Sequence, residues 1–227
     1  MSKTVGTSNK NEVASEVVFD PKAVEARFKK WFPDLSGEII TRLVAYQSEL
    51  LAVNKTINLV PSGTSRNAEA VHFADSIYAC RLIRPQLLKN NAPIYDFGSG
   101  NGLPGLIFGI LFPDVRVILM DRDSRKLEFC KSMASKLKLE NVTFQSGGIE
   151  DLPVQSVVNA VTRGVAPLQR ALLVARKQVV KGGRLFHLKD DGWANELAQV
   201  PSQLFTFWSP SLLGQYKIPE TSNEMAV

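Results

Sequence analysis

The amino-acid sequence predicts an α/β fold: a mostly parallel β-sheet flanked by helices, with a helical extension on its N-terminal side. Three observations support this prediction. From residue 93 onward, short β-branched runs alternate with segments of helical periodicity, a pattern typical of parallel sheets with helices on both faces. A glycine-rich stretch, YDFGSGNGLPG, joins the first run to the first of these helices. Before residue 90, apolar residues recur mainly at helical spacing.

The N-terminal part is expected to be helical. Residues 1–18 are polar and are expected to form a disordered tail. Asp20 followed by proline is a typical helix start, a second helix is expected from Ser36, and a third over about 67–82. The extension is too short to stand alone and has one apolar face, so we expect residues 19–90 to pack on the rest of the chain.

The second part of the chain, over residues 91–220, is predicted to be the α/β domain. Its expected strands are PIYDF, VRVILMD, VTFQ, VVNAVT and GRLFHL. Its expected helices are LPGLIFGILF, SRKLEFCKSMASKLKL and PLQRALLVARKQVV. LFTFW and SLLGQYKI are expected as closing strands, and residues 221–227 as a tail.

Composition limits the environment and the partners. The sequence has no apolar run of the ~20 residues that a membrane span needs and no signal peptide. Cys80 and Cys130 are isolated and lie outside any metal-ligand spacing, so we expect reduced thiols, no metal and a cytoplasmic monomer. The net charge of +5 permits a polyanionic partner without requiring one. Basic clusters around Arg27, Arg81 and Arg122 would bind phosphates if they met in space.

The glycine-rich stretch has the features of a cofactor-binding loop. Gly98, Gly100 and Gly102 allow a tight turn and a close approach of ligand to backbone. Asp121 ends the second predicted strand, about 20 residues beyond the loop, the spacing at which an acid binds ribose hydroxyls. Together they predict an adenosine-containing cofactor, and at this point both NAD and S-adenosylmethionine remain open.

Asp96, two residues before the first glycine, favours S-adenosylmethionine, because an acid suits a positively charged cofactor and repels a pyrophosphate. Neither cysteine is placed for nucleophilic attack, as C5 methylation of cytosine usually needs. The Pro-Pro motif of amino-group methyltransferases is replaced by VTRGVAP after the fourth strand. A ring nitrogen with a free lone pair, such as guanine N7, needs neither a base nor a covalent catalyst, and is weakly favoured.

Four stretches resemble the RsmG (GidB) family of bacterial 16S rRNA guanine-N7 methyltransferases. They are Asn54-Lys55 with Asn58-Leu59, His72-Phe73-Ala74-Asp75-Ser76, DFGSGNGLPG, and KLEFCKSMASKLKLENV followed by Thr162-Arg163-Gly164. The similarity runs from about residue 36 to residue 190. The resemblance implies a Rossmann-like class I methyltransferase that uses S-adenosyl-L-methionine and methylates N7 of a guanine in the 530-loop region of 16S rRNA, as naked rRNA or in the 30S subunit.

The resemblance also implies roles for single residues. Gly98 and Leu103 would contact the methionine end of the cofactor, and Arg163 would lie where cofactor and base meet. The predicted cofactor-binding residues are Asp96, Gly98, Gly100, Gly102, Leu103, Asp121, Ile149, Glu150 and Arg163. Arg163 is also a predicted catalytic residue, together with His72 in a positioning role, and Asp75-Ser76 is expected to brace the glycine loop.

Four positions depart from the family pattern: Val60, Val71, Gly164 and Asp190. They lie on the presumed RNA side and leave alternatives open. These alternatives are a methyltransferase for another RNA or a small molecule, an NAD-binding enzyme, and an RNA-binding assembly factor of weak activity.

Overall fold

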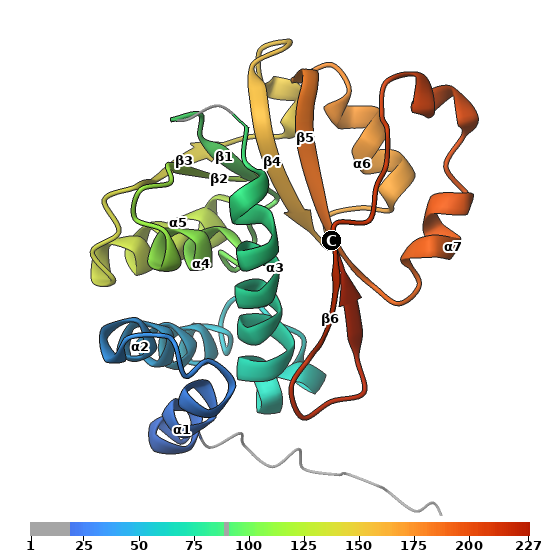
Figure 1. Cartoon of the computed structure of the whole chain (residues 1–227). Helices are drawn as coiled ribbons and strands as arrows, with labels where there is room; N and C mark the ends of the chain where they lie inside the picture. The colour runs from blue at the N-terminus through green and yellow to red at the C-terminus, as the bar shows by residue number, and fades with distance from the viewer. Residues whose placement is uncertain (1–18, 89–90) are drawn as a thin grey trace, which may run out of the picture.

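The computed structural model describes residues 19–88 and 91–227, so the tail predicted over residues 1–18 lies outside the described part (Figure 1). The strands are β1 Ile94–Phe97, β2 Val117–Asp121, β3 Val142–Ser146, β4 Val157–Arg163, β5 Val179–Asp190, β6 Gln215–Lys217 and β7 Glu224–Ala226. The α-helices are α1 Pro21–Trp31, α2 Gly37–Val53, α3 Asp75–Ile83, α4 Gly105–Leu111, α5 Ser124–Lys136, α6 Leu168–Ala175 and α7 Trp193–Ala198.

The sheet has seven strands in the order β3-β2-β1-β4-β5-β7-β6. The first five in this order pair in parallel, whereas β7 pairs antiparallel with both β5 and β6. The predicted mostly parallel sheet is therefore confirmed. The chain builds outward from β1 to β3, then returns to add β4 on the other side of β1. Ligands bind at such a switch point, outside the carboxyl ends of the strands.

Two hydrophobic cores cover the two faces of the sheet. Val117 and Leu119 of β2 belong to the larger core, which α1 to α5 share, and Met120 belongs to the smaller one. Successive strand residues point to opposite faces, so this division follows from the pleat. Ala175 of α6 completes the smaller core. The glycine loop therefore leaves β1 between two packed layers, which fixes its position.

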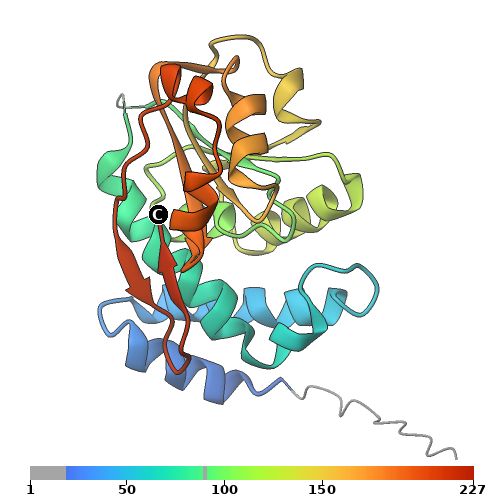
Figure 2. The ribbon, with the colours of Figure 1, turned by 90° about the vertical axis from the view of Figure 1, so that its right-hand side faces the viewer.

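The N-terminal helices begin where the sequence predicts. Asp20 caps α1, and its side chain accepts hydrogen bonds from two backbone amides; Ser36 caps α2 and accepts one, from the amide of Ile39. The third predicted helix is less regular, since a 3-10 helix over Ser62–Asn67 and a π-helix over Glu69–Ala74 precede α3. Figure 2 shows this helical layer lying below the sheet, with the C-terminal hairpin running alongside α3.

Three local predictions are wrong. The helix expected to continue to Val180 ends at Ala175, and β5 begins at Val179. LFTFW forms a 3-10 helix over Ser202–Thr206 instead of a strand. Residues 221–227, expected as a tail, contain β7, which fills the edge of β5 by antiparallel pairing. Unpaired backbone groups along a sheet edge favour such pairing, and a three-residue strand carries no local pattern that reveals it.

Candidate functional site

The glycine loop is preformed and tied to β2. Gly98, Gly100 and Gly102 have φ of 68°, 53° and 88°, in the left-handed region that favours glycine. The amides of Gly98 and Ser99 both donate to the carbonyl of Met120, at 2.8 and 2.9 Å. Backbone hydrogen bonds to β2 thus hold the turn of the loop.

Asp121 lies directly beside this loop. Its Oδ2 accepts the Gly100 amide at 2.7 Å, and its Oδ1 accepts the Asp123 amide at 2.9 Å. The side chain is half-buried at the carboxyl end of β2. Each carboxylate oxygen keeps a second lone pair, so Asp121 can still accept hydrogen bonds from two hydroxyl groups. The residues present therefore fit the ribose of an adenosine-containing cofactor.

Asp96 is buried beneath the loop, with 1% of its surface exposed. Its Oδ2 accepts the amide of Gly105 at 2.9 Å. Burial raises the pKa of Asp96 to about 7, opposed by the Gly105 hydrogen bond and the charge of Arg163. The carboxylate does not reach the loop surface, so its effect on a bound molecule is exerted through the loop it holds and the charge it carries.

Ile149 and Glu150 lie in a 3-10 helix, Ile149–Asp151, that follows β3. The Gly147 amide donates to the Asp121 carbonyl at 3.1 Å, so this turn adjoins the end of β2. Ile149 is half-buried, whereas Glu150 is exposed and forms an ion pair with Arg122. The structure thus brings both residues to the same edge of the sheet as the glycine loop.

The helical extension braces the loop from below. Tyr46 of α2 is fully buried and donates to the Asn101 carbonyl at 2.6 Å. Cys80 of α3 donates from Sγ to the Pro104 carbonyl at 3.7 Å, and from the α/β domain Cys130 of α5 donates to the Gly100 carbonyl at 3.5 Å; both cysteines are free and buried. Burial raises the pKa of both thiols, so they stay protonated. No sequence pattern indicates that either cysteine contacts the loop.

Tyr46→Phe is expected to lower the melting temperature and weaken cofactor binding. The variant leaves the Asn101 carbonyl buried without its donor, which costs ~1–3 kcal/mol. In a chain of this size each kcal/mol lowers the melting temperature by roughly 2–4 °C. Tyr95→Phe is the matched control, because the Tyr95 hydroxyl has no hydrogen bond within the described residues. Equal melting curves for the two variants would argue against the brace.

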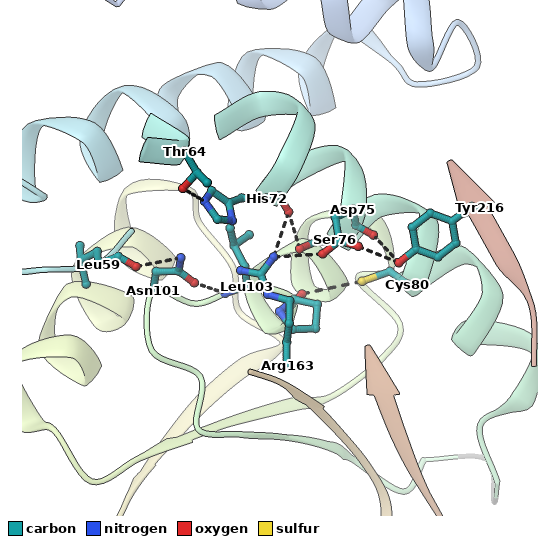
Figure 3. A network of polar contacts seen from close by, with 11 residues as sticks. Leu59, Thr64, His72, Asp75, Ser76, Cys80, Asn101, Leu103, Arg163 and Tyr216 are labelled. Atoms are coloured by element: carbon teal, nitrogen blue, oxygen red, sulfur yellow. Dashed lines mark hydrogen bonds and ion pairs between the residues drawn. The ribbon is translucent and has the colours of Figure 1, made fainter. Parts of the chain in front are cut away.

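Arg163, at the end of β4, is held by the helical extension (Figure 3). Its Nη1 donates to Asp75 Oδ2 at 3.2 Å and to the His72 carbonyl at 3.4 Å. Ser76 Oγ donates to the same carbonyl at 2.7 Å, and Tyr216 donates to Asp75 Oδ1 at 2.8 Å. Asp75 and Ser76 therefore hold Arg163 and its anchor. We expected Asp75 and Ser76 to brace the glycine loop, but their hydrogen bonds in the described residues are with the His72 carbonyl, Arg163 and Tyr216 instead.

His72 is neutral and is held by a neighbouring hydroxyl. Its Nε2 forms a hydrogen bond with the Thr64 hydroxyl at 2.8 Å, and the same hydroxyl lies 3.1 Å from the Pro61 carbonyl. Burial and the charge of Arg163 lower the pKa of His72 to about 3. Nδ1 of His72 has no hydrogen-bond partner within the described part of the chain. His72 lies in the π-helix, a distortion frequent at functional sites.

Two departures from the family pattern have structural explanations. Gly164 has φ of 65°, which favours glycine, although a Cβ there would meet open space. The turn brings the next residue, Val165, against the glycine loop, where its Cγ2 would overlap a Cβ on Gly98. Val60 is buried, and its amide donates to Asn54 Oδ1 at 2.8 Å. Val60 thus belongs to the turn that closes α2.

The basic clusters do not form a free cationic surface. Arg27, Arg81 and Arg122 each have a carboxylate partner. The ion pairs of the three clusters also include Lys29–Glu25, Lys30–Glu220, Arg84–Asp114 and Arg125–Asp123. Their charges are largely neutralised by neighbours. Along residues 19–88 and 91–227, no group of acidic, histidine and cysteine side chains could hold a metal, and no helix is long and apolar enough to cross a membrane.

Comparison with known proteins gives a consistent set of relatives. The sequence profile of GidB, rRNA small subunit methyltransferase G, matches residues 39–209. Ribosomal RNA small subunit methyltransferase G 3 of Bdellovibrio bacteriovorus is 45% identical over 196 residues, covering 85% of this chain and 87% of that protein. Ribosomal RNA small subunit methyltransferase G of Paracoccus denitrificans is 30% identical over 161 residues, 71% of this chain and 81% of that protein. Among solved structures, coclaurine N-methyltransferase bound to N-methylheliamine and SAH covers 86% of this chain and 72% of its own, with 14% identity and a TM-score of 0.49.

Proposed function

Since this chain belongs to the rRNA small subunit methyltransferase G family, we propose that it transfers a methyl group from S-adenosylmethionine to N7 of a guanine in the 530-loop region of 16S rRNA. The observation that carries the proposal is the hydrogen bond from the Gly100 amide to the Asp121 carboxylate, which places an acid beside the glycine loop at the switch point of the sheet. The proposal includes a cytoplasmic monomer that acts on 16S rRNA or on the 30S subunit.

We propose that residues at the carboxyl ends of β1, β2, β3 and β4 bind the different parts of the cofactor. Asp121 takes the ribose, and the turn of Ile149 and Glu150 flanks the adenine. The methionine end lies along the glycine loop and beside Arg163. Gly98, Gly100, Gly102 and Leu103 form that part of the loop. When bound, S-adenosylmethionine supplies a methyl group on a positively charged sulfur. Asp96 supports this charge through its field, since an anion close by favours a cation in a site of low dielectric.

The titration behaviour of the site suits an acceptor that has no proton to lose. The lone pair of guanine N7 forms the new N–C bond while the C–S bond breaks and its electron pair stays on sulfur. His72, with a pKa near 3, is too weak a base to remove protons efficiently at neutral pH. Methylation of guanine N7 does not require a base, because N7 carries no proton.

Asp75 also offsets the positive charge of Arg163 beside the proposed acceptor base. Methyl transfer moves a positive charge onto the base, and an unpaired guanidinium nearby would oppose it. The buried Asp75 carboxylate offsets the charge of Arg163. Arg163 can then hold an acceptor oxygen of the guanine or a phosphate, and the free Nδ1 of His72 can form a hydrogen bond with the guanine. We propose these two side chains as the ones that position the base.

Deletion of the gene tests the proposal in the cell. We expect mass spectrometry of 16S rRNA from the deletion strain to show an unmethylated guanine in the 530-loop region. Wild-type protein should restore 7-methylguanine there, whereas Arg163→Ala should restore at most a small fraction of it. Methylation that persists in the deletion strain would remove this chain as the enzyme responsible.

A further inference from the structure

We propose that Tyr216, on the C-terminal hairpin, is a positioning residue that acts through Asp75 to hold Arg163 for methyl transfer. The inference rests on the proposed function, because Arg163 matters only if the reaction takes place beside it. It adds a residue that neither the family resemblance nor the sequence pattern indicates.

Asp75 joins two parts of the chain that are far apart in sequence. Its Oδ1 accepts the Tyr216 hydroxyl at 2.8 Å, and its Oδ2 accepts Arg163 Nη1 at 3.2 Å. The Asp75 side chain is 2% exposed and that of Arg163 is 17% exposed. The carboxylate therefore works as a bridge between β6 and the end of β4, shielded from water on nearly all sides.

The contacts of Arg163 leave part of it available. Within the described residues, all its hydrogen bonds use Nη1, to Asp75 and to the His72 carbonyl. Nε and Nη2 keep their donors for a ligand. A guanidinium is rigid and planar, so fixing one nitrogen sets the direction of the others. The position of Asp75 thus determines where Arg163 presents its free edge.

Tyr216 helps Asp75 to stay ionised. Burial raises the pKa of Asp75, while the charge of Arg163 and the hydrogen bonds from Tyr216 and Arg163 oppose that rise. The other titratable groups that interact with this cluster are His72, which is neutral, the protonated thiol of Cys80 further along α3, and Asp96, whose pKa is about 7. Without the Tyr216 hydroxyl, Asp75 would take up a proton at higher pH and its hold on Arg163 would weaken.

The hairpin that carries Tyr216 lies beyond the part of the chain that the family profile matches, which ends at residue 209. β7 joins it to the sheet through β5, and the ring of Tyr216 stacks on Tyr78 of α3 with centroids 5.3 Å apart. Figures 1 and 2 both show the hairpin beside α3. The C-terminal hairpin is thus fastened against the helix that carries Asp75.

Tyr216→Phe tests the proposal, with Tyr78→Phe as the matched control from the same stacked pair. The Tyr78 hydroxyl has no hydrogen bond to Asp75 within the described residues. At saturating S-adenosylmethionine, where the effect of Asp96 on affinity no longer limits the rate, we expect the acidic limb of the rate–pH profile to move up by about one pH unit or more in Tyr216→Phe, as for loss of a hydrogen bond to a charged group. The profile of Tyr78→Phe should match the wild type. Superimposable profiles for the two variants would overturn the proposal.

A double-mutant cycle separates positioning from general destabilisation. If Tyr216 acts through Asp75, adding Tyr216→Phe to Asp75→Asn should change the rate and its pH profile no further. Effects that simply add would overturn the proposal.

The NMR signal of the Arg163 side chain, assigned with Arg163→Lys, gives a readout that does not depend on activity. Its acidic transition should move up in Tyr216→Phe only, and an unmoved transition would contradict the inference. A wild-type chain that methylates no RNA would instead remove the proposed function, leaving this titration interpretable.

Discussion

Gly98→Val is expected to abolish binding of S-adenosylhomocysteine in calorimetry. Gly98 has φ of 68°, where a β-branched residue is strained by ~1–2 kcal/mol, a factor of about 5 to 30 in the population of the loop conformation. A Cβ there would also overlap Val165, which packs against the loop, so either Val165 or the loop must move. The added methyl groups take space that a ligand needs beside the backbone. Together these effects predict a loss of more than about 100-fold in affinity.

Two glycine controls separate the causes of that loss. A Cβ on Gly63, in the 3-10 helix, meets open space, so Gly63→Ala should bind like the wild type. Gly164→Ala shares the left-handed backbone, with φ of 65°, but meets no neighbour, so it reports the strain alone. Near wild-type affinity in a folded Gly98→Val variant would show that the glycine loop is not where the cofactor binds.

Asp96→Asn is expected to stabilise the protein above pH 7 and to weaken binding of S-adenosylmethionine. The pKa of Asp96 rises from its ordinary 3.8 to about 7 in the fold, so the folded state binds the proton more tightly than the unfolded state. Wild-type stability therefore falls as the pH rises from about 4 to about 7 and stays low above it. Asparagine does not titrate, so the variant should gain up to ~4 kcal/mol on the wild type between pH 4 and pH 8.

The same substitution should weaken the binding of S-adenosylmethionine. A unit charge roughly 8–16 Å away is worth ~1–2 kcal/mol at an effective dielectric of about 20, so the neutral variant should bind S-adenosylmethionine about tenfold more weakly at pH 8. The affinity of the wild type should rise between pH 6 and pH 8, and that of Asp96→Asn should not. S-adenosylhomocysteine, which lacks the sulfonium charge, should respond less. If wild-type affinity is independent of pH, the electrostatic role of Asp96 is wrong.

The geometry of the proposed cofactor-binding half of the site was largely predictable because its signals are local. Glycines and an acid at fixed offsets from strand ends placed the loop and Asp121, and the strands carried β-branched runs that need no distant partner. The five parallel strands were therefore all foreseen. The ends of helices were less certain, since QVV after α6 suits either a helix or a strand until the sheet edge is known.

Apart from Tyr216, the residues around Arg163 were named from the sequence, but their mutual contacts could not be foreseen, because they span the chain. Asp75 is 88 residues from Arg163, and Tyr216 is 141 residues from Asp75. Arg163 pairs with Asp75, because β4 ends beside the π-helix and α3. The neutral state of His72 likewise depends on burial and on Arg163, neither of which a sequence pattern expresses.

Transfer of a labelled methyl group from S-adenosylmethionine to naked 16S rRNA and to 30S subunits, followed by mapping, tests the central claim most directly. We predict label on one guanine of the 530-loop region, recovered as 7-methylguanine, in at least one of the two substrates. Unlabelled RNA in both, from a protein that still binds S-adenosylhomocysteine, would contradict the account, as would label on another nucleotide or another atom.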